Sequence, residues 1–357
     1  MHRFSITTLV MLTCGISPLG QSVFAGEPSS ATPALDCLGK FTAADVPATG
    51  PAEIPVDPLK GASSEPGPVS LPGKGPAQHP MLYIGEGYNR MLLVNDGKVI
   101  WGYSTGPGWE YDDIWLLSNG NILFSRMQYA AEVTPQKKIV WRLDAEKGTE
   151  IHTVQPLGLD RVFLVQNGKP PKLMIINKKT GAAEVSHELV APSPAGPGGV
   201  HGQFRRARVT ASGTYLLPWL SLGKVIEYDK DFKVIWSYDI KSPWAAVRLH
   251  NSNTLITDEQ DELTREVDPS GKTVWEFKLA DLPPEIKFKG SQSCVRLANG
   301  NTVFCSRGDG KNCQLVEITP DKKVVWAMSD WKNFGPATAV QMLDDPGIPE
   351  NPGDLQR

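Results

Sequence analysis

The stretch GGVHGQFRRARV, residues 198–209, concentrates the residue types that most often bind an anion. It places His201, Arg205, Arg206 and Arg208 beside a glycine-rich approach. The guanidinium group of arginine binds carboxylate, sulfate or phosphate through two parallel hydrogen bonds. A small anionic molecule is therefore the ligand that this stretch favours. The alternative is that alternate arginines face solvent or a neighbouring part of the fold.

A second stretch, STGPGWEYDD at residues 104–113, combines aromatic and acidic side chains: Trp109, Glu110, Tyr111, Asp112 and Asp113. A few polar groups beside aromatic rings are typical of sites for small molecules. This composition suits a sugar or an aromatic ligand. A structural alternative is that Trp109 only covers the surface of the fold.

Motifs of several common enzymes and binding proteins are absent from the sequence. It contains no G-x-S-x-G, no H-E-x-x-H and no Walker-type loop. The histidines lack the spacing of metal ligands, and we expect neither a metal site nor another cofactor. The net charge is −3 and no long basic run occurs, which argues against a nucleic-acid partner.

A repeated motif defines the elements that must position these residues. A lysine stands three places before a tryptophan five times, at Trp101, Trp141, Trp236, Trp275 and Trp326. The intervals are 40, 95, 39 and 51 residues, and the long interval fits two repeats with one tryptophan missing near Val185. A period of about 40–50 residues with four strands per repeat is typical of the blades of a β-propeller.

Each repeat can be divided into strands. In residues 246–277 we predict strands over 246–249, 254–258, 263–267 and 273–277, separated by turns rich in Asn, Gly, Pro and Ser. The tryptophan falls on the last strand, where a large ring can fill the wedge between blades, and the lysine begins that strand in solvent.

The two ends of the domain complete one blade. Residues 81–104 supply three strands, and residues 337–345 resemble the missing first strand. Pairing these segments closes the ring and removes its free sheet edges. The prediction is an all-β fold, a six-bladed β-propeller of four-stranded blades over residues 81–357, with one blade closed by N- and C-terminal strands.

The first strand of each blade lines the axis of a propeller. Aligning the repeats on their turns brings six residues to one level: Asp112, His152, Arg205, Trp244, Gln292 and Thr338. Mixed polar groups that converge in this way are typical of a small-molecule site. The alternative is that the axis is simply lined by polar groups in contact with water.

The repeat pattern LxNGNTL/V…VxEVxPxGKxVW, at residues 111–142, 244–277 and 291–328, resembles the repeats of pyrroloquinoline-quinone-like propellers. It is most similar to the subgroup that includes bacterial arylsulfotransferases. That resemblance implies a histidine on the axis as a transiently sulfated nucleophile. His152 and His201 would be the candidates, with Arg205 stabilising the sulfuryl charge. The chain departs from that pattern with Asp112, Trp244 and Gln292 where histidines would be expected.

Two functions remain open from the sequence. The first is a module that binds a small, anionic molecule or a protein partner through the central channel face. The alternative is an arylsulfotransferase-like enzyme that transfers a sulfuryl group.

The N-terminal residues indicate export. Residues 1–25 combine a basic start, a short apolar stretch and Val-Phe-Ala before Gly26, which is typical of a signal peptide. The apolar run is shorter than the roughly 20 residues of a membrane-spanning helix, so we expect no transmembrane segment in the mature chain. The mature protein would be periplasmic or extracellular.

Two further features concern the exported chain. Residues 26–80 are rich in Pro and Gly, particularly from Phe41, and are expected to form an extended tether or strap. Export permits disulfides, and four cysteines remain in the mature chain: Cys37, Cys294, Cys305 and Cys313. They allow three pairings. We expect structural cysteines, with a bridge around the last repeat as the pairing to look for.

Overall fold

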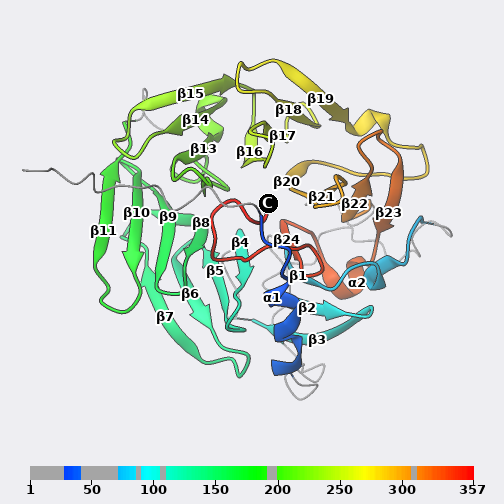
Figure 1. Ribbon diagram of the computed structural model, residues 1–357, viewed down its shortest axis with the longest axis horizontal. Helices are drawn as coiled ribbons and strands as arrows, with labels where there is room; N and C mark the ends of the chain where they lie inside the picture. The colour runs from blue at the N-terminus through cyan, green and yellow to red at the C-terminus, as the bar shows by residue number, and fades with distance from the viewer. Residues whose placement is uncertain (1–27, 42–70, 86–89, 105–109, 191–198, 307–311) are drawn as a thin grey trace, which may run out of the picture.

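The computed structural model describes residues 28–41, 71–85, 90–104, 110–190, 199–306 and 312–357. Its strands form six four-stranded antiparallel sheets arranged as blades around a central axis (Figure 1). The predicted six-bladed β-propeller is confirmed. The predicted signal peptide lies outside the described residues, as do Trp109 and most of the expected strap.

The blades share one strand order from the axis outward, and each is named here by its strands. They are β24 (Ala339–Met342), β1 (Met81–Ile84), β2 (Met91–Asn95) and β3 (Lys98–Tyr103); β4 (Asp113–Leu116), β5 (Ile122–Arg126), β6 (Tyr129–Val133) and β7 (Ile139–Asp144); β8 (Glu150–Leu157), β9 (Arg161–Asn167), β10 (Lys172–Asn177) and β11 (Ala183–Glu188); β12 (Arg208–Val209), β13 (Tyr215–Trp219), β14 (Lys224–Tyr228) and β15 (Val234–Asp239); β16 (Pro243–Arg248), β17 (Thr254–Asp258), β18 (Leu263–Val267) and β19 (Thr273–Lys278); β20 (Ser291–Arg296), β21 (Thr302–Ser306), β22 (Leu315–Ile318) and β23 (Val324–Met328).

The closing blade joins the two ends of the domain as expected. β24 pairs antiparallel with β1, with Met81 opposite Met342 and Ile84 opposite Ala339. Of the strands predicted for residues 246–277, β17 and β18 have the predicted bounds. β16 begins three residues before the predicted start, because Pro243 already pairs with Asp258.

The lysine–tryptophan motif has the same local structure in each blade that carries it. The residue before the lysine has a φ between 61° and 86°, at Gly97, Lys137, Phe232, Gly271 and Lys322. This left-handed conformation closes a tight turn and leads into a β-bulge. All five lysines are exposed, as predicted. In the blade without the tryptophan, Val185 pairs with Ile175 at the equivalent place.

The tryptophans join neighbouring parts of the ring. The indole of Trp101 donates a hydrogen bond to the carbonyl of Pro135 in the next blade at 2.8 Å. Trp275 does the same with Pro320 at 2.9 Å. Trp326 instead donates to Gly75, in the segment that precedes β1. These contacts support the expected role of the tryptophans between blades. Of the five tryptophans in the motif, only Trp101 and Trp326 are fully buried.

Residues 343–357, termed here the C-terminal tail, cross the axis where the inner strands end (Figure 1). Glu350 accepts hydrogen bonds from the backbone of Ser118 and Gly158, in the turns that follow β4 and β8. Gln356 accepts from the backbone of His250 and Arg296, at the ends of β16 and β20. The tail therefore covers this end of the axis and contacts several blades at once.

The helices of the described residues are short. They are α1 (Pro33–Asp36), η1 (Cys37–Lys40), η3 (Gly75–Ala77), η4 (Leu220–Leu222), η5 (Leu279–Asp281) and α2 (Trp331–Phe334). Across these residues, no helix has the length and apolar character needed to cross a membrane.

The cysteines correct one expectation. Cys37, Cys294, Cys305 and Cys313 are all buried free thiols, so the anticipated bridge around the last repeat is not formed. Burial raises the pKa of Cys294 to about 12 and that of Cys313 to about 11. These thiols are neutral at physiological pH and act as small apolar groups in the packing.

Candidate functional site at the start of the inner strands

A cluster of charged side chains lies at the end of the axis opposite the C-terminal tail. We name it the mouth cluster; its members are Glu110, Asp112, Glu150, His152, His201 and Arg205. Glu110 and Asp112 precede β4, Glu150 and His152 begin β8, and His201 and Arg205 precede β12. Three consecutive blades therefore build the cluster.

β-Bulges determine which residues of the inner strands reach the axis. In β8 the pairing with β9 passes from Ile151 to Thr153 and skips His152. In β20 the pairing with β21 skips Gln292 in the same way, and the register of β16 also shifts next to Trp244. A bulge bends a strand and redirects a side chain, and bulges are common beside functional sites.

Glu150 holds the two imidazole rings of the mouth cluster. Its Oε2 lies 2.7 Å from Nε2 of His152 and 2.9 Å from Nδ1 of His201. The rings meet edge to face, with centroids 5.1 Å apart. Burial by itself would raise the pKa of Glu150, but the hydrogen bonds from the two histidines outweigh it and lower that pKa to about 2. Glu150 is therefore ionised, and it orients both rings.

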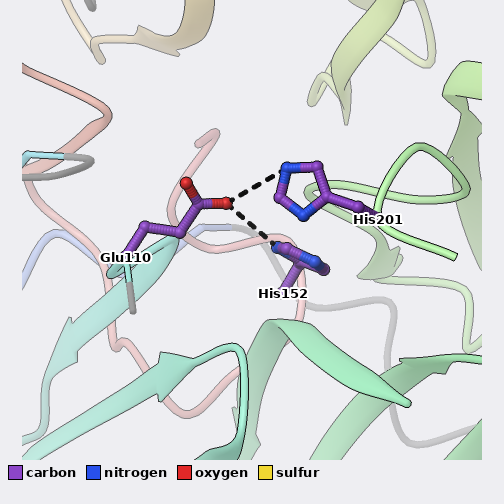
Figure 2. Close-up of side chains that lie close together, drawn as sticks. All are labelled: Glu110, His152 and His201. Atoms are coloured by element: carbon purple, nitrogen blue, oxygen red, sulfur yellow. Dashed lines mark ion pairs between the residues drawn. The ribbon is translucent and has the colours of Figure 1, made fainter. Parts of the chain in front are cut away.

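The other ring nitrogens point toward one carboxylate (Figure 2). Oε1 of Glu110 lies 3.9 Å from Nδ1 of His152 and 3.5 Å from Nε2 of His201. These three ligand atoms all lie within 4.8 Å of one another. His201 is 42% exposed whereas His152 is buried, so the group is reached from the side of His201.

Asp112 adds a second carboxylate beside His152. Its Oδ2 is 3.0 Å from Nδ1 of His152, close enough for an ion pair. The two atoms are not aligned for a hydrogen bond, and neither carboxylate oxygen of Asp112 has a hydrogen-bond partner in the described parts of the chain. Buried polar atoms without partners are costly, and several in one place point to an additional ligand.

Arg205 and Trp244 complete the surroundings. Nη2 of Arg205 lies 2.9 Å from Nε2 of His201, and its guanidinium carbon lies 4.7 Å from the centre of the Trp244 ring. Because arginine can only donate, Nε2 of His201 accepts and its proton is on Nδ1, facing Glu150. Three carboxylates and two imidazoles of the mouth cluster thus face a single guanidinium group.

The structure brings four of the six aligned residues into this region. Asp112 contacts His152, and Arg205 stacks on Trp244. Gln292 and Thr338 are buried at the corresponding places of the last two blades. The backbone carbonyls of both accept hydrogen bonds from hydroxyl groups of the preceding blade, Thr257 and Ser293, as that of His152 does from Ser125. Ser125 and Thr257 both belong to the second strand of a blade, so these contacts place His152 and Gln292 at equivalent positions.

Glu150 was not selected from the sequence. It lies two residues before His152, which in a strand places both side chains on the same face, so this spacing was an available signal. No local signal linked Glu110 to the histidines, because the three come from different blades. The scattered histidines predicted no metal site. The separations of 42 and 49 residues between Glu110, His152 and His201 match no local ligand motif.

Comparisons with known proteins show the fold. No family model matches the chain, and no curated protein matches it. Among solved structures, a protein of unknown function from Bacteroides caccae is 24% identical, with a TM-score of 0.66, over 73% of this chain and 97% of that one. The chain is thus similar in fold to a solved protein of nearly its own domain length.

Two other structural neighbours are a lyase variant and a WD40 domain. A catalytically inactive variant of virginiamycin B lyase from Staphylococcus aureus, solved with quinupristin, is 12% identical over 75% of this chain and 91% of that one, with a TM-score of 0.54. The WD40 propeller domain of Doa1 is 13% identical over 66% and 73%, with a TM-score of 0.50. At these identities the shared property is the propeller fold, which hosts unrelated functions.

Proposed function

We propose that the protein is a binding propeller whose mouth cluster holds a divalent metal ion and, through it, a small ligand. One observation carries the proposal: Nδ1 of His152 and Nε2 of His201 both face Oε1 of Glu110. Two imidazole nitrogens and one carboxylate oxygen are a common ligand set for zinc and neighbouring transition metals.

The distances suit such an ion. Bonds of about 2.0–2.2 Å from zinc to nitrogen and oxygen place tetrahedral ligand atoms roughly 3.3–3.6 Å apart. The separations from Glu110 are 3.5 and 3.9 Å. Small side-chain movements, with the release of Nε2 of His201 from its hydrogen bond to Arg205, would complete the geometry. Glu150 would act as the outer carboxylate that orients metal-binding histidines. The three carboxylates of the mouth cluster, set against one guanidinium group, would favour a bound cation.

The neighbouring residues indicate which groups would surround a further molecule bound to the ion. Three protein ligands leave a coordination position for water or another molecule. Arg205 offers guanidinium N–H groups next to that position, and Trp244 offers an aromatic face. A small anionic molecule bound to the metal and to Arg205 is consistent with the arginine-rich sequence of this segment.

Metal titration tests the proposal. Protein stripped with a chelator should bind one equivalent of Zn²⁺ by calorimetry, and His201→Ala should remove this binding. Glu150→Gln should weaken it about 10–100-fold, the usual effect of losing an outer carboxylate. His250→Ala, which alters a histidine outside the cluster, is the matched control. Failure to bind Zn²⁺, Ni²⁺ or Mn²⁺ stoichiometrically would refute the metal site, as would unchanged binding in His201→Ala.

One contact favours the sulfuryl-transfer alternative. Arg205 lies beside Nε2 of His201, where it would stabilise charge on a sulfated histidine. Chelator-treated protein can be assayed with 4-nitrophenyl sulfate as donor and phenol as acceptor. We expect no turnover. Metal-independent transfer that disappears in His201→Ala would replace the binding proposal with this alternative.

A further inference from the structure

A second charged group lies further along the axis, between the mouth cluster and the C-terminal tail. We name it the arginine cluster; it consists of Arg206, Arg208 and Arg357 around Asp113. Arg208 binds both oxygens of Asp113, at 2.7 and 3.1 Å. Arg206 lies 3.4 Å from the same carboxylate. Arg357, from the tail, donates to the carbonyl of Val340 and stacks on Trp115 at 4.2 Å.

Several N–H groups of the arginine cluster have no protein acceptor. Arg206 and Arg357 are each 2% exposed. Nε and Nη1 of Arg206, and Nη1 and Nη2 of Arg357, make no hydrogen bond with the residues that the structure describes. Guanidinium groups bind oxyanions and halide ions strongly. In a buried site, leaving their N–H donors without hydrogen-bond acceptors is costly.

The charges of the arginine cluster do not balance. Arg206 and Arg208 form ion pairs with Asp113, and Arg357 forms no ion pair within the described chain. Asp113 is thus the one side-chain carboxylate paired with these three guanidinium groups. If the main-chain carboxylate of Arg357 is also counted, one positive charge still remains. Burial raises the pKa of Cys294 and Cys305, so these nearby thiols supply no negative charge.

Arginine cannot relieve this imbalance by losing a proton. Burial lowers the pKa of Arg208 to about 10 and also lowers that of Arg357. A pKa of about 10 keeps Arg208 protonated at physiological pH, and guanidinium groups in proteins generally retain their proton. Uncompensated buried charge of this size is not stable in a protein interior.

We infer that the arginine cluster binds a small inorganic anion. The unsatisfied donors of Arg206 and Arg357 supply its hydrogen bonds, and its charge offsets the excess of guanidinium groups. A cavity of about 20 Å³ borders Arg208 and Arg357, whereas Arg206 lies outside its lining. Because about 10–15 Å³ holds one water molecule, this space suits an ion of about the size of chloride. As Arg357 belongs to the C-terminal tail, the bound anion also fastens the tail to the blades.

The melting temperature of the full chain tests this inference. Protein is dialysed into gluconate buffer, and gluconate is then replaced by chloride or by sulfate at constant ionic strength. We expect a saturable rise of about 5 °C at a concentration about 100-fold above the dissociation constant. Arg357→Met should abolish the rise, and in gluconate alone it should melt no lower than the wild type, because it removes an uncompensated cation.

Arg161→Met is the matched control, since Arg161 is an exposed arginine at the start of β9 and does not belong to the arginine cluster. It should keep the wild-type response. Crystals soaked in bromide give an independent measurement, in which we expect an anomalous peak in contact with Arg206 and Arg357. A melting temperature indifferent to both anions, an equal rise in Arg357→Met, or a bromide-soaked crystal without that peak would overturn the proposal. The metal titration of the mouth cluster does not depend on any of these results.

Discussion

At the scale of single residues, the recurrent tryptophans contribute unequally to stability. Trp326 is fully buried, and its indole also binds Gly75. Trp275 is only partly buried, although its indole makes an equivalent bond to Pro320. The lysine three places before each tryptophan is exposed. The motif therefore pairs an interior group with a surface group at a constant interval.

Trp326→Ala should lower the free energy of unfolding by about 3–5 kcal/mol, the usual cost of deleting a buried large aromatic ring. Trp275→Ala should cost less, because less of that ring is buried. Lys323→Ala should change the stability by less than about 0.5 kcal/mol. Urea denaturation of the three variants measures these differences. Similar losses for Trp326→Ala and Lys323→Ala would show that the lysine is not a simple surface residue.

His79 gives a residue-scale prediction about pH. It lies 2.8 Å from Asp344 and 3.1 Å from Glu317. Burial alone would disfavour the charged ring, but hydrogen bonds with Asp344 and Glu317 outweigh it and raise the pKa of His79 to about 9. The pKa is above the unfolded value of about 6.5. The stabilisation is therefore complete below pH 6.5 and is lost as the pH rises through 9.

Wild type should consequently exceed His79→Gln in melting temperature at pH 6, and the difference should shrink between pH 7 and pH 10. The corresponding free energy is at most about 3 kcal/mol. A difference that is the same at pH 6 and pH 10 would mean that the ion pairs of His79 do not stabilise the fold.

At the scale of elements, β24 decides whether the ring is closed. It pairs with β1 and forms the innermost strand of the closing blade. A chain ending at Trp331 lacks this strand and leaves open edges on a three-stranded blade. We expect that chain to lose cooperative thermal unfolding. A chain ending at Met342 keeps β24 but lacks the C-terminal tail, and should unfold cooperatively at a lower temperature than the full chain. Cooperative melting of the shorter chain within a few degrees of the full length would refute the closure argument.

At the scale of the whole molecule, acidic and basic side chains gather at different levels of the axis. The mouth cluster has more carboxylates than guanidinium groups where the inner strands begin, and the arginine cluster has more guanidinium groups than carboxylates behind it. The C-terminal tail covers the opposite end. A ligand of the kind proposed for the mouth cluster would therefore approach from the side of His201, the more exposed of its two histidines.

Export is a prediction for the whole chain. We expect cleavage near Ala25–Gly26 because the preceding residues have the pattern of a signal peptide. Mass spectrometry of the protein from its native host would identify the mature N-terminus. Retention of Met1, or a lipid on Cys14, would contradict this prediction.

Much of the architecture is determined by the sequence alone. The spacing between successive lysine–tryptophan motifs indicated the length of one repeat and thereby the number of blades. The repeat without tryptophan has Val185 at the equivalent place. The resemblance of residues 337–345 to a first strand predicted the closing blade. These features are readable because turn residues and strand periodicity act within one repeat, over distances of a few residues.

The candidate sites depended on tertiary structure. The mouth cluster joins Glu110, His152 and His201 from three blades, and bulges that skip single residues aim the inner side chains. The arginine cluster needs Arg357, which reaches the axis only because the C-terminal tail folds across it. Neither the direction of a side chain at a bulge nor the path of an irregular tail is encoded in a local repeat. Both follow from the packing of the closed ring, which brings residues far apart in sequence to one axis.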